Sequence, residues 1–460
     1  LSPTDSRFAE IADLYYKELT RLYGKSDYYS MDPFHESGND AAVDYGKAGE
    51  ALMSAMKRAN PHAIWVVQGW NENPRPQMIA NLKVGDLLVL DLFSESRQNF
   101  EDFCTEDNTS GTGKKNFSTS KKEGIYGKHQ WLFCLLENFG GNVGLHGRMD
   151  QLLNNFYLAT GKKDTPKQEN SSLLTLHSSL KGWGFTMEGS ENNPVMFELM
   201  SELPWRAEKI TKEDWIREYC YARYGVHDAT IEKAWTLLAQ SIYNCPKGNI
   251  QQGTHESIFC ARPSLNSYQV STWSLMSNYY DPEDTRQAAI LLTSVAEKYR
   301  GNNNFEYDLV DICRQALADQ GRKQYLKTMA DFKAFSRQDF KKDSDRFLKM
   351  IQLQDKLLGT RQEFRLGHWI EEARSLGKTA EEKDLYEWNA RVQITTWGNR
   401  ICADNGGLHD YGHKEWQGLL KDFYYLRWST FMKSLASQLS LQDTPRIDWY
   451  GLEDSWTLQK

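Results

Sequence analysis

Trp65-Val-Val-Gln-Gly-Trp70 is a short, mostly apolar run, and runs of this kind decide the fold class. The strand predicted here, residues 63–68, overlaps this run and is almost entirely apolar, as expected of a parallel strand covered on both faces. Four similar runs occur, at residues 27–32, 86–91, 130–136 and 181–187. Helix-period stretches near 40–58 and 144–160 lie between these runs, and another near 193–202 follows the last of them. The alternation predicts an α/β arrangement around a parallel sheet.

A helix is expected before the first strand. Ser2 is a candidate cap, Pro3 would occupy the first turn, Asp5 would lie near the positive end of the helix, and Gly24 would end it. Apolar residues recur at helical spacing between these signals. These signals therefore predict a helix over about residues 2–24.

The pattern changes near residue 206, where long helix-period segments replace the strand signals. Thr211 and Asp214 resemble a capping box with Asp in place of Glu, and Gly225 ends the helix that follows. Further amphipathic stretches cover 229–244, 283–299, 304–335, 339–376, 379–396 and 412–438. We predict an α/β catalytic domain over 1–205 and an all-α domain over 206–460.

Five parallel strands are too few to close an eight-stranded (β/α) barrel, and they leave open edges beside an apolar interior. About three strands would be missing from such a barrel. Either an N-terminal segment of the same protein completes the barrel, or the fold is a smaller open α/β sheet. The helix before the first strand favours the former.

Composition excludes several classes of function. The 460 residues carry a net charge of −7 with both signs interspersed, so no broad basic field would attract nucleic acid or an anionic membrane. No apolar run reaches the roughly 18 residues that a membrane span needs. The seven cysteines lie far apart without zinc-like spacing, so we expect no metal and no cofactor. Cys245 and Cys260 are the nearest pair that a disulfide would join.

Two glutamates follow strand-like runs, where a (β/α) barrel places its chemistry. Glu36 ends Asp32-Pro-Phe-His-Glu36, and Glu188 follows Gly182-Trp-Gly-Phe-Thr-Met187. Glycoside cleavage needs one carboxylic acid to protonate the leaving oxygen and one carboxylate to attack carbon or activate water. Other carboxylates near strand ends, which salt bridges would also explain, are Asp91, Glu95 and Glu137.

Neighbouring residues single out this pair. The His35 ring is placed to hydrogen-bond a carboxyl group or a sugar, and Trp70 to stack on a sugar ring or to pack beneath a loop. In the helical region Trp397 and Tyr411 flank a glycine-rich loop, residues 398–412, which would otherwise only connect helices.

At these residues the sequence resembles the α-N-acetylglucosaminidases, glycoside hydrolase family 89. The shared motifs run nearly end to end in the same order: Tyr29–Glu36, Trp65–Trp70, Leu88–Ser96, Glu137–Asn142, Met187–Gly189, Arg223–Gly225, Tyr243–Cys245, Arg262–Ser264 and Thr396–Gly398. The resemblance implies a small N-terminal domain, a (β/α)₈ barrel and an all-α C-terminal domain. This chain would hold the last barrel strands and the whole helical domain.

The resemblance also implies a retaining exo-hydrolase that releases terminal α-linked N-acetylglucosamine from a glycan. Glu36 matches the family's acid/base and Glu188 its nucleophile, while Trp70 matches a sugar-contacting tryptophan. Trp397, Leu408 and Tyr411 match residues that the helical domain contributes to the pocket. His35 replaces the Asn of animal members, and Glu137 their His, which indicates a bacterial branch with an extracellular or periplasmic location; animal relatives are lysosomal.

Two other interpretations stay open at this level. One is a non-catalytic carbohydrate-binding remnant of the same fold. The other is a helical interaction scaffold whose α/β part is structural.

Overall fold

The computed structural model describes residues 2–35, 43–71, 73–97, 100, 128–161, 179–189, 191–248, 253, 255–271 and 277–459. The chain divides into two compact units. The α/β unit comprises Leu1–Leu136, Gln151–Thr186 and Met200–Lys209; the helical unit comprises Glu137–Asp150, Met187–Leu199 and Ile210–Lys460. The predicted division at residue 205 stays a prediction.

The α/β unit is built on a five-stranded sheet in the order β1-β2-β3-β4-β5, and every neighbouring pair is parallel. The strands are β1 (Tyr28–Ser30), β2 (Ile64–Gly69), β3 (Leu87–Asp91), β4 (Gln130–Leu135) and β5 (Leu180–Phe185). All five predicted strands are confirmed, as is their parallel arrangement. Strands in sequence order with helices between them are the repeating unit of a (β/α) barrel.

The strands have the apolar character of a covered sheet. Trp65 in β2, Val89 in β3 and Phe133 in β4 are fully buried. Cys134 is likewise buried in β4 as a small hydrophobic residue. In contrast, β1 has an exposed residue on either side of Tyr29, and every residue of β5 is at least partly exposed. The buried centre of the sheet therefore lies in β2, β3 and β4.

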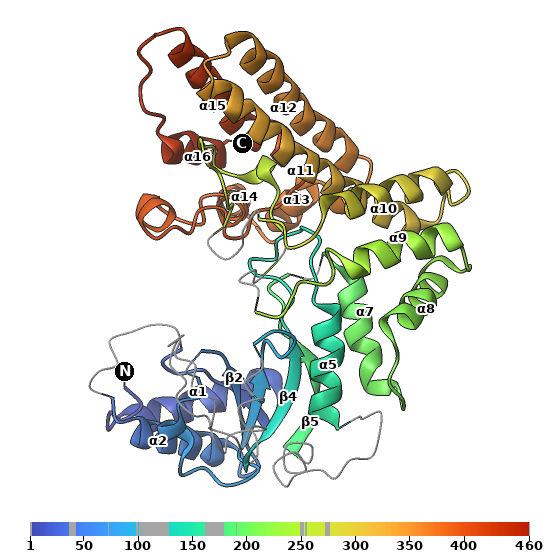
Figure 1. Cartoon of the computed structure of the whole chain (residues 1–460). Helices are drawn as coiled ribbons and strands as arrows, with labels where there is room; N and C mark the ends of the chain where they lie inside the picture. The colour runs from blue at the N-terminus through green and yellow to red at the C-terminus, as the bar shows by residue number, and fades with distance from the viewer. Residues whose placement is uncertain are drawn as a thin grey trace, which may run out of the picture. The chain divides into compact units, whose positions relative to one another are not determined.

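Helices α1 (Phe8–Tyr23) and α2 (Tyr45–Ala59) lie together beside the blue part of the sheet (Figure 1). Asp44 caps α2 by accepting a hydrogen bond from the backbone of Lys47, and Arg58 of α2 pairs with Asp13 of α1 at 2.8 Å. Gly24 ends α1 with φ of 85°, as predicted. The predicted start at Ser2 is wrong, because a turn from Ser2 to Asp5 precedes the helix. The remaining helices named within 1–205 are α3 (Pro76–Ile79), α5 (Met149–Thr160), α7 (Pro194–Glu202) and the 3₁₀ turn η2 (Leu203–Trp205).

The helical unit follows the predicted pattern. Besides most of α7, its helices are α8 (Lys212–Tyr224), α9 (Ala229–Gln240), α10 (Pro282–Val295), α11 (Asn303–Lys333), α12 (Arg337–Leu358), α13 (Leu366–Ser375), α14 (Ala380–Gln393), α15 (Tyr425–Leu439) and α16 (Trp449–Thr457). Short 3₁₀ segments are η3 (Ile258–Cys260) and η4 (Gln362–Phe364), and short π-helical segments are η5 (Ile401–Asn405) and η6 (Leu420–Tyr424). No strand is found in its described residues, which confirms an all-α region.

The details of capping agree with the sequence at α8, where Thr211 accepts a hydrogen bond from Asp214 N at 3.1 Å and Gly225 ends the helix at φ of 81°. Two stretches differ. The stretch 339–376 is divided into α12 and α13 at Gly359, and the stretch 412–438 becomes helical only at Leu420. Helix α16 was not predicted.

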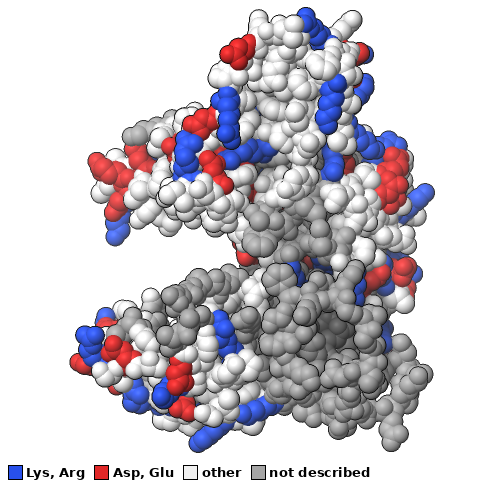
Figure 2. Space-filling model, turned by 60° about the vertical axis from the view of Figure 1, so that its left-hand side comes forward, with Lys and Arg blue, Asp and Glu red and all other residues white. Residues whose placement is uncertain are grey.

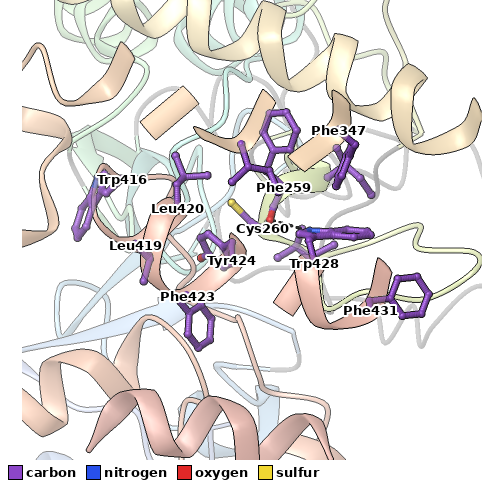
Figure 3. Close-up of a cluster of buried hydrophobic side chains, with 14 of the residues drawn as sticks. Phe259, Cys260, Phe347, Trp416, Leu419, Leu420, Phe423, Tyr424, Trp428 and Phe431 are labelled. Carbon is purple, nitrogen blue, oxygen red and sulfur yellow. Dashed lines mark hydrogen bonds between the residues drawn. The ribbon is translucent and has the colours of Figure 1, made fainter. Parts of the chain in front are cut away.

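An aromatic core holds the helical unit together (Figure 3). The buried Trp428 ring of α15 lies 4.8 Å, centroid to centroid, from Phe347 of α12, and its Nε1 donates a hydrogen bond of 3.1 Å to the carbonyl of Phe259. Burying each such aromatic side chain contributes a few kcal/mol. This packing fixes α12 and α15 against the segment around η3.

Charged side chains of both signs are interspersed over the described surface in the view of Figure 2. Among the described residues, no helix is long and apolar enough to cross a membrane, and no cluster of His, Cys, Asp or Glu has a metal-binding arrangement. Cys245 and Cys260 are both buried as free thiols.

Candidate functional site

Glu188 follows the end of β5 by three residues and belongs to the helical unit. Its Oε2 accepts two hydrogen bonds of 2.6 Å, one from the backbone N–H of Gly140 and one from the hydroxyl of Tyr411. Within this unit its Oε1 accepts no hydrogen bond from a described residue. One oxygen is thus fixed while the other is available to a ligand.

The Gly140-Gly141 pair makes this geometry possible. Both residues have φ of 63°, a conformation that costs side-chain-bearing residues free energy. A Cβ on Gly140 would lie 2.0 Å from the carbonyl oxygen of Tyr411, far inside van der Waals contact. Only glycine allows the backbone to pass this closely and to aim the Gly140 N–H at the carboxylate.

Buried asparagines hold the segments that carry Gly140 and Glu188. Asn138 donates through Nδ2 to the carbonyl of Gly189 at 2.9 Å and to Oδ1 of Asn192 at 2.7 Å. Asn192 in turn donates to the carbonyl of Asn142. These side chains are at most 3% exposed, so replacing one would leave buried polar groups without partners. The network makes the position of Glu188 rigid.

The loop that carries Tyr411 is fixed at both of its ends. Trp397 has φ of 62° and donates its N–H to the carbonyl of Val392 at 2.8 Å. Asp410 donates its N–H to the carbonyl of Thr395 at 2.6 Å. The Asp410 carboxylate is fully buried and pairs with Arg427 Nη2 at 3.0 Å. The loop is therefore ordered around a buried ion pair.

These residues open onto a pocket of about 280 Å³, which lies wholly within the helical unit. Four aromatic side chains form much of its lining, Trp369, Trp397, Tyr411 and Trp416. The remaining lining residues are Gly140, Glu188, Gly189, Glu191, Gln393, Ile394, Gly412 and Lys414. Aromatic faces beside carboxylates suit a sugar, whose C–H groups stack and whose hydroxyls form hydrogen bonds.

Lys414 gives the pocket a cationic group beside its carboxylates. Burial lowers the pKa of its ammonium from 10.5 to about 8, and the charge of Glu191 opposes that shift. Its Nζ donates a hydrogen bond to the carbonyl of Gly141. Lys414 therefore also supports the glycine pair that positions Glu188.

The structure brings three of the predicted residues together, namely Glu188, Trp397 and Tyr411. Leu408 does not line the pocket; its carbonyl accepts the N–H of Tyr411 at 3.2 Å and so shapes the turn before it. His35 and Trp70 lie in the α/β unit, where Trp70 is 6.4 Å from the Phe93 ring between centroids. Glu36 lies outside the described residues.

Six lining residues belong neither to the predicted site residues nor to the shared motifs or the 398–412 loop: Glu191, Trp369, Gln393, Ile394, Lys414 and Trp416. Lys414 and Trp416 come directly after Tyr411-Gly412, so extending that motif would have found them. Trp369 and Gln393 lie in α13 and α14 and carry no local signal.

Two other carboxylates near strand ends serve the structure of the α/β unit. Asp91 is fully buried and accepts a hydrogen bond from Ser94 Oγ at 2.9 Å. Glu95 is also fully buried, and its Oε1 accepts the N–H of Leu136 at 3.0 Å. Glu137 is 2% exposed, in the helical unit.

Family models match both parts of the chain. The model described as the alpha-N-acetylglucosaminidase (NAGLU) tim-barrel domain matches residues 1–207. The model of the corresponding C-terminal domain matches residues 215–460.

Individual relatives agree with the family models. The human alpha-N-acetylglucosaminidase is 29% identical over 96% of this chain and 55% of its own length. A family 89 glycoside hydrolase from Clostridium perfringens, solved in complex with PUGNAc, superimposes with a TM-score of 0.87 at 31% identity, over 99% of this chain and 48% of that one. A variant from the same organism with two Glu→Gln substitutions, in complex with its substrate GlcNAc-α-1,4-galactose, gives 0.86 at 30% identity, over the same shares of the two chains.

The chain thus spans about half the length of the relatives that it matches. The end-to-end agreement confirms the resemblance carried by the sequence motifs. The chain belongs to the α-N-acetylglucosaminidase family, glycoside hydrolase family 89.

Proposed function

We propose that the protein containing this chain is a retaining exo-glycosidase that releases terminal α-linked N-acetylglucosamine from glycans. The observation that carries the proposal is Glu188 in an aromatic pocket, with Oε2 fixed by Gly140 and Tyr411 and Oε1 available. Family membership supplies the chemistry, and the substrate complex of the Clostridium perfringens relative, GlcNAc-α-1,4-galactose, supplies the sugar class.

In the first step, Oε1 of Glu188 attacks the anomeric carbon while the protonated carboxyl of Glu36 gives its proton to the departing glycosidic oxygen. The product is a β-linked ester between the sugar and Glu188. In the second step, Glu36 removes a proton from water, which attacks the same carbon and frees Glu188. Two inversions release N-acetylglucosamine as the α-anomer, and both carboxyl groups return to their first states.

His35 and Trp70 are assigned to sugar contacts in this proposal, as are Trp397 and Tyr411. Leu408 is assigned to shaping the Tyr411 turn. No metal or organic cofactor takes part in the two-glutamate reaction.

We further assign the five-stranded sheet to the C-terminal part of a (β/α)₈ barrel that an N-terminal segment of the same protein completes. In the described residues β1 pairs only with β2, and β5 only with β4. Helix α1 also leaves large apolar side chains exposed, among them Ile11 at 52%, Leu14 at 59% and Leu22 at 58%. Barrel closure would pair both outer strands, and further helices would cover such a face. An extracellular or periplasmic location accords with action on glycans.

The test uses the complete polypeptide and two substrates, GlcNAc-α-1,4-galactose and an aryl α-N-acetylglucosaminide with an acidic phenol as leaving group. Glu188→Gln should lose roughly 10³-fold or more in kcat on both substrates, because the nucleophile is needed whatever the leaving group. Glu36→Gln should lose far more on the disaccharide, whose leaving group needs a proton. Glu371→Gln, an exposed site on α13, is the control and should leave both rates unchanged.

Proton NMR of the first product identifies the stereochemistry. Initial release of the α-anomer supports retention, and initial release of the β-anomer contradicts it. Saturable sugar binding without turnover by the complete protein would favour a carbohydrate-binding remnant. Absence of both sugar binding and turnover would favour a structural scaffold.

A further inference from the structure

A second pocket, of about 320 Å³, lies on the helical unit. It is formed between one face of α11 and the loop that follows η3. Its principal polar residues are Asn266, Ser267, Tyr268, Arg322, Tyr325 and Lys333. None of these residues belongs to the pocket around Glu188.

The pocket is preformed, because hydrogen bonds tie its loop to α11. Tyr325 donates its hydroxyl hydrogen to the carbonyl of Ser264 at 3.0 Å and accepts the N–H of Ser267 at 2.8 Å. Lys333 Nζ donates to Asn266 Oδ1 at 3.2 Å. Since Tyr325 is only 1% exposed, these bonds are shielded from water and stabilise the loop.

Arg322 is the unusual member of the pocket. Its Nη1 is buried, and it forms neither a hydrogen bond nor an ion pair with any residue that the structure describes. A guanidinium nitrogen shielded from water normally has an anionic or hydrogen-bonding partner, because desolvating it alone is costly; the Arg322 side chain as a whole is half-buried. Burial accordingly lowers the pKa of Arg322.

Burial lowers the pKa of Arg322 by more than the nearby Asp319 carboxyl raises it. No lining residue of the pocket is an Asp or a Glu, and Lys333 adds a second positive charge. Asp319, one turn away on α11, is buried and accepts a hydrogen bond from Tyr280 at 2.9 Å. Burial raises the pKa of Asp319 to about 7, so it is largely protonated in mildly acidic solution. The pocket is thus cationic in a chain of net charge −7.

The pocket also has features that suit a sugar ring. The Tyr268 side chain is 63% exposed and that of Leu326 55%, so an aromatic face and an apolar surface are available for contact. Arg322 and Lys333 are eleven residues apart on one helix, which places their Cα atoms about 16 Å apart. Two long cationic side chains placed this far apart on one helix can each contact a different anionic group of one ligand.

We propose that this pocket is a binding site for an acidic saccharide, in which Arg322 pairs with one sulfate or carboxylate, Lys333 pairs with a second, and Tyr268 stacks on a ring. The site is separate from the catalytic pocket and does not rest on the proposed hydrolase activity. It would retain acidic glycans on the helical domain.

Calorimetric titration of the complete protein tests this with a sulfated, uronate-containing disaccharide that lacks N-acetylglucosamine. Sodium sulfate and the desulfated, carboxyl-reduced disaccharide serve as comparison ligands. We expect the acidic disaccharide to bind at least tenfold more tightly than either, with weaker binding at 200 mM than at 50 mM salt.

Variants locate the binding. Arg322→Met and Lys333→Gln should each weaken it tenfold or more, and Tyr268→Ala several-fold. Lys323→Gln is the matched control, because this substitution removes the same charge from the same helix. Lys323 is exposed and does not line the pocket. Lys333 and Tyr268 are exposed, so their variants test the site even where Arg322→Met alters folding.

Three results would overturn the proposal. Equal losses in Lys323→Gln and the pocket variants would mean non-specific attraction to the helix. Sulfate binding as tightly as the disaccharide would mean that the pocket recognises only a small anion. Absence of measurable disaccharide binding at 50 mM salt would remove the site altogether.

Discussion

The hydroxyl of Tyr411 donates a 2.6 Å hydrogen bond to Oε2 of Glu188, a residue 223 positions earlier in the chain. The bond connects the loop after α14 to the segment that follows the last described strand. The Glu188 carboxylate therefore has one oxygen held by a residue from outside the span, residues 1–207, that the barrel-domain model matches.

Tyr411→Phe removes this hydrogen bond and keeps the ring, whose centroid lies 4.8 Å from that of Trp397. A hydrogen bond to a charged group contributes about 1.5–3 kcal/mol, so we expect kcat/KM of the complete enzyme to fall roughly 10- to 100-fold. Steady-state kinetics on an aryl α-N-acetylglucosaminide measures this. Tyr386→Phe, an exposed tyrosine of α14, is the control, and an equal loss in both variants would remove the assigned role.

Trp397→Ala should mainly weaken sugar binding. Trp397 lines the pocket and is 39% exposed, so its face is open to a ligand. We expect KM to rise about tenfold with kcat changed only a few-fold, since aromatic contacts of this kind contribute about 1 kcal/mol or more. Trp388→Ala is closely matched, because Trp388 is 40% exposed and lies outside the pocket. An unchanged KM in Trp397→Ala would argue against sugar contact there.

Gly140→Ala should disrupt the site by steric conflict. Its Cβ would meet the Tyr411 carbonyl at 2.0 Å, and its φ of 63° is also unfavourable for alanine. We expect activity below about 1% of wild type and a lower thermal midpoint, since relieving the overlap moves the N–H away from Glu188. Gly225→Ala separates the two causes, because Gly225 has φ of 81° and open space around its Cβ position. That control should lose only about 1 kcal/mol of stability and keep its activity.

The Asp410–Arg427 pair should make the free energy of unfolding fall as the pH is lowered into the acid range. Burial alone would raise the pKa of the Asp410 carboxyl, but the charge of Arg427 and a hydrogen bond from His409 lower it from 3.8 to about 2. A folded pKa below the unfolded value means that the contribution is complete above about pH 4 and is lost as pH falls towards 2.

Thermal unfolding of Asp410→Asn measures that contribution. We expect a loss of about 3 kcal/mol at pH 7, because one partner of a buried pair is removed, and a smaller difference from wild type at pH 2.5. Asp345→Asn removes an exposed partner of Lys341 and should cost less than about 1 kcal/mol at either pH. A difference for Asp410→Asn that stays constant with pH would contradict the linkage.

Local patterns made much of the fold predictable. Each apolar run such as Trp65–Gly69 became a strand, because burial on both faces of a parallel sheet leaves a nearly continuous hydrophobic signal. Thr211 and Gly225 marked both ends of α8 through short-range capping. The start of α1 was misjudged because Ser2 and Asp5 stabilise a turn as well as they would a helix.

The site was less accessible to sequence reasoning, because it is assembled from distant segments. Glu188 and Tyr411 were found through motifs, but Trp369 reaches the pocket through the packing of α13 and α14, which no local pattern encodes. Similarly, the need for glycine at Gly140 arises from the close approach of Tyr411, a contact across the fold.

The central claim is that Glu188 is the nucleophile, and covalent trapping tests it most directly. The complete enzyme is incubated with a 5-fluoro N-acetylglucosaminyl fluoride, which slows hydrolysis of the glycosyl-enzyme ester, and is then digested and analysed by mass spectrometry. We predict a single sugar adduct, found on the peptide that contains Glu188 and attached to the side chain of that residue. Activity should fall in proportion to the fraction of enzyme labelled. An adduct on Glu191, the neighbouring carboxylate of the same pocket, or inactivation without any adduct, would contradict the account.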